Sequence, residues 1–208
     1  MTTQLDLTAL PPQERYKLLT AVVIPRPVAW VTTQDSLGQV NAAPFSFFNV
    51  FGQDPALVIL GLEHARDGSG PKDTARNIAE TGEFVVNIVT PDLILPMVET
   101  AASYPPGVSE PEALDLALAP SGQVAPPRLA AAPVAIECRL RDTLRYSDER
   151  DIVVGEALAL SARDGLIDTD RMHVDWGGDF PIARLFADRY ARLEEIARHP
   201  IPEPKEQP

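Results

Sequence analysis

The sequence is poor in cysteine, with one residue, Cys138, in 208. A single thiol cannot form an internal disulfide or a cysteine-only metal site. The three histidines, His64, His173 and His199, lie far apart, so we expect no metal site. No run approaches the roughly 20 apolar residues that a membrane-spanning helix needs. The chain does not open with a basic segment followed by an apolar stretch, so we expect no signal peptide and a cytoplasmic protein.

Positive charge is also scarce. The chain has 18 lysines and arginines against 30 aspartates and glutamates, a formal net charge of −12 at pH 7. Nucleic acids attract basic surfaces, so we expect no nucleic-acid partner. A single bound nucleotide is still compatible with this charge, because it needs only a local cation or a few backbone amides.

The length is sufficient for one domain with a sizeable core. The 21 prolines cluster at both ends and between Tyr104 and Pro133, where they indicate loops. We find no internal repeat and no linker. The sequence therefore predicts one domain over residues 1–208, with an ordered core over residues 10–198 and flexible ends. The tail, His199–Pro208, is expected to be disordered or wrapped on a partner.

The first half of the chain predicts short strands with few helices. A hairpin at Gln34–Gln39 would pair the first two strands in antiparallel fashion. Asp73 is the expected N-cap of the second helix. The expected helices are Arg15–Leu19 and Thr74–Glu80, and the expected strands are Val28–Thr33, Val40–Phe48, Ala56–Gly61 and Glu83–Val89.

The second half adds an alternating strand, Val134–Leu144, in which Glu137 is expected on the polar face. Many short strands in one domain of this length indicate a closed or partly closed antiparallel barrel. The fold class is therefore mainly β, a β-barrel with flanking helices. The other expected elements are helices in Pro91–Ala102, Glu110–Leu118 and the second half of Phe180–Ile196, and a strand at Asp151–Leu160.

Large apolar residues alternate with hydroxyl and amide residues between Asn41 and Asn49. In an extended segment such side chains point to opposite faces. One interpretation is a strand that forms the wall of a ligand site, with aromatic bulk beside short hydrogen-bonding groups. The other is a buried strand that enters a turn, with Pro44 as an edge or bulge marker.

Lys72 and Thr74 fall at the start of a predicted helix. Free backbone N–H groups and the positive end of the helix dipole favour an anion there. A lysine and a hydroxyl beside them form a plausible phosphate site. Helix capping by Asp73, with Lys72 in solvent, explains the same residues without a ligand.

Five short motifs occur in order along the chain. They are Pro-Arg-Pro-x-x-Trp-Val-Thr-Thr from Pro25, Gly-x-x-Asn-x-Ala-Pro-Phe-Ser-Phe-Phe-Asn from Gly38, Asp54-Pro55, Lys-Asp-Thr-x-x-Asn-Ile from Lys72, and Thr-Gly-Glu-Phe-Val-Val-Asn from Thr81. Together they resemble the flavin reductase-like family with the FMN-binding split barrel, most closely its flavoredoxin-type branch. The resemblance is dense over Pro25–Val89 and weak near Arg184–Tyr190, where Phe186-Ala187-Asp188 replaces a frequent glycine-rich stretch.

The resemblance implies a homodimer with FMN near the subunit interface. It implies that Ser46, Asn49, Lys72 and Thr74 hold the phosphate and ribityl chain, with Asp73 and Asn77 in support. The isoalloxazine would lie against two strands that include Trp30, Thr32, Thr33, Ala43 and Phe47. Arg26 is either a structural anchor or a ligand contact.

The function that follows is an oxidoreductase that passes electrons from NADH or NADPH through FMN to a small acceptor. No catalytic acid–base pair is evident, and none is needed, because a flavin carries the redox chemistry. A flavin-binding electron carrier without turnover is the alternative, and a barrel that has lost the flavin is a third possibility. The acidic surface favours a small acceptor, or a redox partner protein with a basic patch.

Overall fold

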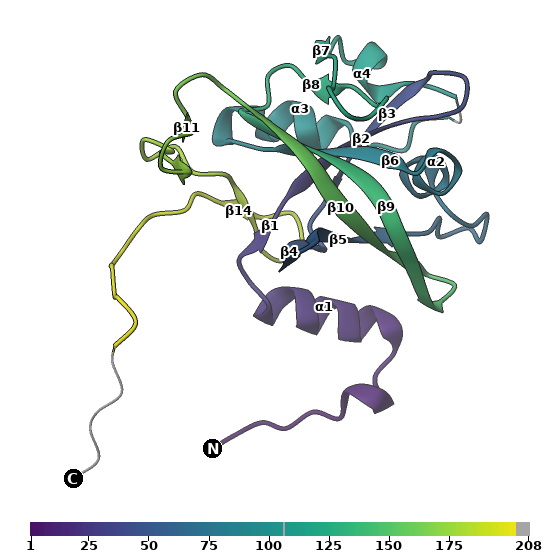
Figure 1. The fold of residues 1–208 in the computed structure, drawn as a ribbon. Helices are drawn as coiled ribbons and strands as arrows, with labels where there is room; N and C mark the ends of the chain where they lie inside the picture. The colour runs from purple at the N-terminus through teal and green to yellow at the C-terminus, as the bar shows by residue number, and fades with distance from the viewer. Residues whose placement is uncertain (106, 203–208) are drawn as a thin grey trace.

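The centre of the molecule is an antiparallel sheet of seven strands, in the order β3-β2-β6-β9-β10-β5-β4. The computed structural model describes residues 1–105 and 107–202. The predicted β-rich architecture is confirmed (Figure 1). The strands are β2 (Ala29–Gln34), β3 (Val40–Phe45), β4 (Phe48–Gln53), β5 (Ala56–Glu63), β6 (Glu83–Ile88), β9 (Val134–Ser147) and β10 (Arg150–Ala162).

The two outermost strands of this sheet, β3 and β4, are consecutive in the chain. Only Ser46 and Phe47 join them. The first and last strands of a seven-stranded sheet can be this close only if the sheet curls on itself. Near this corner the Gly61 N–H donates a 2.7 Å hydrogen bond to the Phe47 carbonyl oxygen. The sheet is therefore a partly closed barrel, as predicted.

The strand predicted over Val40–Phe48 is wrong at its end, because β3 stops at Phe45 and the chain turns. Phe48 begins β4 and is buried in the core. A close approach at Gly61 allows the turn, since a Cβ there would lie 2.9 Å from the Cβ of Phe47. The alternating apolar and polar pattern runs through the turn, so the pattern alone does not mark it.

The barrel interior is filled by apolar side chains from most of its strands, among them Val31, Leu60, Phe84 and Val86. Phe84 and Val86 lie on one face of β6, as its alternation predicts. Cys138 is buried in the same cluster, and burial raises the pKa of its thiol to about 12. The thiol therefore stays protonated and unreactive at physiological pH.

The helices lie around the barrel. Helix α2 (Asp73–Thr81) packs against β2 and β3 and ends at Gly82, which has φ of +73°. Figure 1 shows α1 (Pro12–Val22) beneath the barrel, near β4. No helix in residues 1–105 and 107–202 is long and apolar enough to span a membrane. The remaining helices are η1 (Leu7–Ala9), η2 (Pro91–Leu93), α3 (Ile94–Glu99) and α4 (Glu110–Ala113).

The helix predicted in the second half of Phe180–Ile196 is wrong. This segment contains two short strands, and the first of them pairs Arg184 with Arg26. The helical spacing was misleading because Leu193 and Ile196 are exposed and have no core to face. Residues 203–208 of the predicted tail lie outside the described residues. The short strands are β1 (Arg26–Pro27), β7 (Leu118–Ala119), β8 (Arg128–Leu129), β11 (Ile167–Asp168), β12 (His173–Val174), β13 (Ala183–Arg184) and β14 (Tyr190–Ala191).

Two other predictions need correction. Glu137 was expected on a polar face, but it is 2% exposed, because the chain at Gly122 and Gln123 passes over that face of β9. Its carboxylate accepts the backbone N–H groups of Gly122 and Gln123, at 2.9 and 2.6 Å. The helix predicted over Glu110–Leu118 ends at Ala113.

Candidate functional site

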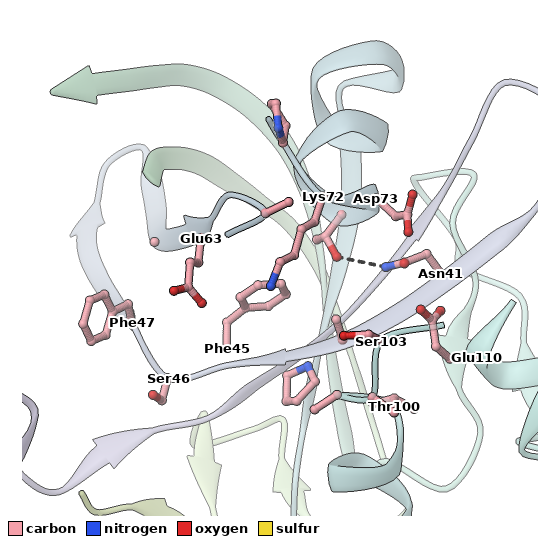
Figure 2. Close-up of a pocket in the computed structure, with 18 of the residues that line it drawn as sticks. Asn41, Phe45, Ser46, Phe47, Glu63, Lys72, Asp73, Thr100, Ser103 and Glu110 are labelled. Carbon is pink, nitrogen blue, oxygen red and sulfur yellow. Dashed lines mark hydrogen bonds between the residues drawn. The ribbon is translucent and has the colours of Figure 1, made fainter. Parts of the chain in front are cut away.

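A pocket of about 580 Å³ lies between the β3–β4 corner and the start of α2. Phe45, Ser46 and Phe47 line it from the corner, and Lys72 and Thr74 line it from α2. Figure 2 shows the Lys72 side chain extending from the start of α2 into this space. The chain thus brings two segments that are separated in sequence to one concave site, with aromatic rings on one side and hydrogen-bonding groups on the other.

The first turn of α2 has no side-chain cap, because Lys72 occupies the N-cap position and its side chain makes no capping hydrogen bond. The prediction that Asp73 is the N-cap is therefore wrong; Asp73 is the first helical residue and pairs with Arg76. The backbone N–H groups at this end carry the positive end of the helix dipole, which favours an anion.

The Thr74 hydroxyl is buried beside this helix end, and the residue is 3% exposed. Its Oγ1 accepts a hydrogen bond from Asn41 Nδ2 at 2.9 Å. A hydroxyl that accepts one hydrogen bond still has its own proton to donate. Within the described chain, neither an acceptor for this proton nor a carboxylate partner for the Lys72 ammonium is present. Both groups are available to a ligand.

The aromatic side of the pocket is reinforced by a residue from a distant strand. The Arg150 guanidinium lies 4.4 Å from the centroid of the Phe47 ring and donates to the Gly61 carbonyl oxygen at 3.1 Å. The Tyr16 ring of α1 lies 6.0 Å from the Phe47 ring, centroid to centroid. Sequence reasoning missed Arg150 and Tyr16, because neither belongs to a motif and only the barrel brings them here.

Residues 21–183 match the model of the flavin reductase-like domain. The chain belongs to the flavin reductase-like family. Its fold is the split barrel, which it shares with a protein from Shewanella frigidimarina that has a split barrel domain, at a TM-score of 0.80.

Three solved structures illustrate the similarity of this flavin reductase-like chain to known proteins. The 2-nitrobenzoate 2-nitroreductase NbaA of Pseudomonas fluorescens is 36% identical with a TM-score of 0.87, covering 99% of this chain and 98% of its own. Component B of nitrilotriacetate monooxygenase from Bacillus cereus is 31% identical with a TM-score of 0.88, covering 96% and 99%. Flavoredoxin of Desulfovibrio vulgaris (Miyazaki F) shares the fold, with 18% identity, a TM-score of 0.75 and coverage of 96% and 97%.

Of the predicted site residues, six line the pocket: Ala43, Ser46, Phe47, Lys72, Asp73 and Thr74. Two more, Thr33 and Asn77, lie behind it, where Asn77 Nδ2 donates to Thr33 Oγ1 at 3.1 Å and both residues are buried. This bond ties α2 to β2 and so fixes the helix end that faces the pocket.

The other three predicted site residues do not line the pocket. The Trp30 indole N–H donates to Thr100 Oγ1 at 3.0 Å in the core outside the barrel. The Thr32 hydroxyl donates to the Pro127 carbonyl oxygen at 2.6 Å. These side chains point away because alternate residues of β2 face opposite sides. Asn49, in β4, is exposed to solvent.

The sequence left two roles open for Arg26, a structural anchor or a ligand contact. Its hydrogen bonds in the structure are those of a structural anchor. The residue is 8% exposed. Its guanidinium donates to the carbonyl oxygens of Thr20, of Val23 at 3.1 Å and of Leu185 at 2.6 Å. It joins the end of α1 to the C-terminal segment, and a 3.4 Å contact to Ser46 Oγ reaches the rim of the pocket.

Glu110 is a further pocket residue that sequence reasoning missed. It is 6% exposed, and its Oε2 accepts the Ala42 backbone N–H at 3.0 Å. Burial raises the pKa of this carboxyl above its usual value. The sequence placed Glu110 in a short helix, but nothing in the sequence signalled which way the side chain points.

Proposed function

We propose that this protein is an FMN-dependent oxidoreductase that takes electrons from NADH or NADPH and passes them to a small acceptor. The observation that carries this proposal is the uncapped start of α2, with Lys72 and Thr74 at a pocket whose wall contains Phe45 and Phe47. An anion site beside an aromatic slot is the combination that a flavin mononucleotide requires.

The donor set in the pocket is compatible with FMN. Lys72, the Thr74 hydroxyl and the first N–H groups of α2 would hold the phosphate. Phe45 and Phe47 would exclude water from the ring system. The pocket volume of about 580 Å³ lies within the roughly 300–1,000 Å³ common for small-molecule sites. Bound FMN would supply the redox chemistry by accepting a hydride and releasing electrons.

Two similar proteins favour turnover over simple electron carriage. NbaA is named for the reduction of a small nitroaromatic acid, and the Bacillus cereus protein is a component of a monooxygenase. Both are more than 30% identical to this chain over nearly its whole length. A small organic acceptor, or a flavin passed to a second component, is therefore the favoured route for the electrons.

The homodimer belongs to the same proposal, with FMN near the interface. Thr20 is the buried residue of α1, whereas Leu19, Val22 and Val23 are 46%, 71% and 59% exposed. An apolar helix surface of this kind is stabilised when a second copy covers it. Tyr16 of the same helix lines the pocket, so a partner covering α1 would lie next to the bound ligand.

The test is the visible spectrum of the purified protein, mixed with FMN and then with NADH or NADPH without oxygen. We expect flavin peaks near about 370 and 450 nm that bleach on addition of the nicotinamide. Flavin peaks that persist after the nicotinamide is added would favour the alternative, an electron carrier without turnover. The absence of FMN binding would exclude both roles. Light scattering during size-exclusion chromatography tests the dimer.

A further inference from the structure

Glu110 is a buried carboxyl without a cationic partner. It is 6% exposed, and no lysine, arginine or histidine of the described chain forms an ion pair with it. Buried glutamates are rare unless they are paired, because removing a charge from water is costly. A glutamine would satisfy the Ala42 N–H equally well and would avoid this cost. The hydrogen bond to β3 therefore does not explain why the residue is an acid.

The carboxyl has one free oxygen in the pocket. Oε2 accepts the Ala42 N–H, and no other residue of the described chain, apart from Glu110 itself, donates a hydrogen bond to the carboxyl. Figure 2 shows Glu110 at the end of the pocket near Asn41, across from Glu63 and Phe47. Ala42 belongs to the outer strand β3, so the carboxyl is fixed against the edge of the barrel while Oε1 remains available.

The titratable groups around this carboxyl come from α4 and from the lining of the pocket. Strand β3, which α4 packs against, carries no titratable side chain. Glu112 is the other titratable group of α4. The titratable groups that line the pocket with Glu110 are Tyr16, Glu63, Asp67, Lys72, Asp73, Arg76, Tyr104, Arg150, Arg184 and Tyr190. The pKa of Glu110 is raised by burial and lowered less by the N–H groups of Ala42 and of Glu110 itself. No charged neighbour is needed to explain it.

We propose that Glu110 is the hydrogen-bond acceptor of the pocket, with Oε2 fixed to the N–H of Ala42 and Oε1 binding an N–H or O–H group of the ligand. This inference rests on the proposed function, because it takes FMN or its redox partner as that ligand. The ionised carboxylate accepts such a bond and the protonated acid does not accept it as well. Ligand affinity therefore increases as the pH rises through the pKa of Glu110.

The test compares Glu110→Gln with a matched control, Glu137→Gln. The variant amide retains an oxygen for the Ala42 N–H but presents an NH₂ group where Oε1 was, so it mimics the protonated acid. Glu137 is also a buried carboxylate that accepts backbone N–H groups, but it does not line the pocket. FMN dissociation constants are measured by fluorescence quenching between pH 5 and pH 8 for the wild type and both variants.

We expect Glu110→Gln to bind FMN about tenfold more weakly than the wild type at pH 8, because a charge-assisted bond is lost. The ratio should fall toward one as the pH is lowered through the pKa of Glu110, because the wild-type carboxyl then becomes protonated. The phosphate of FMN titrates near about pH 6, but it does so in all three proteins and cancels in the ratio. Glu137→Gln should bind FMN like the wild type.

A second measurement addresses the case in which the N–H or O–H group that binds Glu110 belongs to NAD(P)H or to the electron acceptor and not to FMN. In that case FMN affinity is unchanged, and the KM for NAD(P)H or for the acceptor shows the same pH-dependent ratio. The proposal would be overturned if Glu110→Gln and the wild type had equal FMN dissociation constants and equal KM values at every pH. A wild type that binds no FMN at any pH would instead contradict the proposed function itself, so the two failures are distinguishable.

Unfolding by urea provides a readout that does not depend on a ligand. The pKa of Glu110 is raised in the folded protein, so its ionisation destabilises the fold as the pH rises through that pKa. Glu110→Gln should therefore be more stable than the wild type at pH 7, whereas Glu137→Gln should be less stable. A loss of stability in both variants would mean that both carboxyls serve only the fold.

Discussion

Asn41 Nδ2 donates a 2.9 Å hydrogen bond to Thr74 Oγ1, and this bond joins the outer strand β3 to the first turn of α2. Both residues are buried. The bond orients the threonine hydroxyl so that its proton is free, and it holds the helix end at the pocket. One side-chain pair thus links the strand that forms the wall of the pocket to the helix whose start is the proposed anion site.

Removal of the proposed phosphate contacts should weaken FMN binding. The double variant Lys72→Ala with Thr74→Ala loses one cation and one hydroxyl donor. Hydrogen bonds to charged groups contribute about 1.5–3 kcal/mol, so we expect a dissociation constant raised roughly 10- to 100-fold. Fluorescence quenching of FMN measures this change.

The matched control for lost positive charge is Arg66→Ala. Arg66 lies in the same loop, is exposed and does not line the pocket. Arg66→Ala should change the FMN dissociation constant by less than about twofold, since a solvent-exposed charge is screened by salt. An unchanged dissociation constant in the double variant would mean that the FMN phosphate does not bind at the start of α2.

Arg26→Lys should destabilise the fold. An ammonium cannot reach the carbonyl oxygens of Thr20, Val23 and Leu185 together, because it lacks the planar fork of a guanidinium. Buried carbonyl groups would remain unsatisfied, and we expect a loss of about 2–3 kcal/mol in the free energy of unfolding. Urea denaturation checks this, with the exposed Arg163→Lys as the control. Equal midpoints for the two variants would show that the anchor is dispensable.

Asp151 should make stability depend on pH at the acid end. Arg145 donates to its carboxylate at 2.6 and 2.9 Å and is the main cause of its lowered pKa; His64 Nε2 lies 3.0 Å away. A lowered pKa stabilises the fold above the ordinary value of 3.8, and this stabilisation is lost as the pH falls through the pKa of the folded state.

Asp151→Asn is therefore expected to be less stable than the wild type at pH 7, and the difference should shrink below the ordinary aspartate pKa of 3.8. Urea unfolding at pH 7, 5 and 3 measures it. Asp164→Asn, in an exposed turn, is the control. A stability difference that stays constant over this range would mean that the charge of Asp151 is unimportant.

Gly155→Ala should overpack the barrel interior. A Cβ at Gly155 would lie 2.8 Å from Cε1 of the buried Phe84 ring, which must then shift. Overpacking of this kind costs about 1–3 kcal/mol. The control is Gly122→Ala, where the nearest atom to a Cβ, Glu137 Oε1, is 3.8 Å away. Thermal unfolding compares the two, and a Gly155→Ala protein as stable as the control would contradict the packing argument.

The strands and the barrel could be predicted because their signals are local. Alternation in β6 and β9 and the turn at Gly38, with φ of +89°, are properties of neighbouring residues. The start of α2 was predicted at Thr74, within one residue of its actual start at Asp73. These features depend on short-range patterns, which a single sequence contains.

The rest depends on contacts between distant segments. Arg150 reaches the pocket only because β10 pairs with β5, and Glu110 enters it only because its short helix packs on β3. Trp30 was assigned to the flavin from the motif, but which face of β2 it occupies depends on what covers that strand. In the C-terminal segment the helical spacing failed because pairing with β1 determined the conformation.

The corner at Ser46 and Phe47 is at once the seam of the barrel and the rim of the pocket. A ligand bound there contacts the first and the last strand of one sheet. Its binding energy therefore adds to the closure of the barrel, since a ligand stabilises the state that binds it. Backbone amides of β3 and β4 would exchange their hydrogens more slowly when the pocket is filled, while those of the central strand β9 would change little.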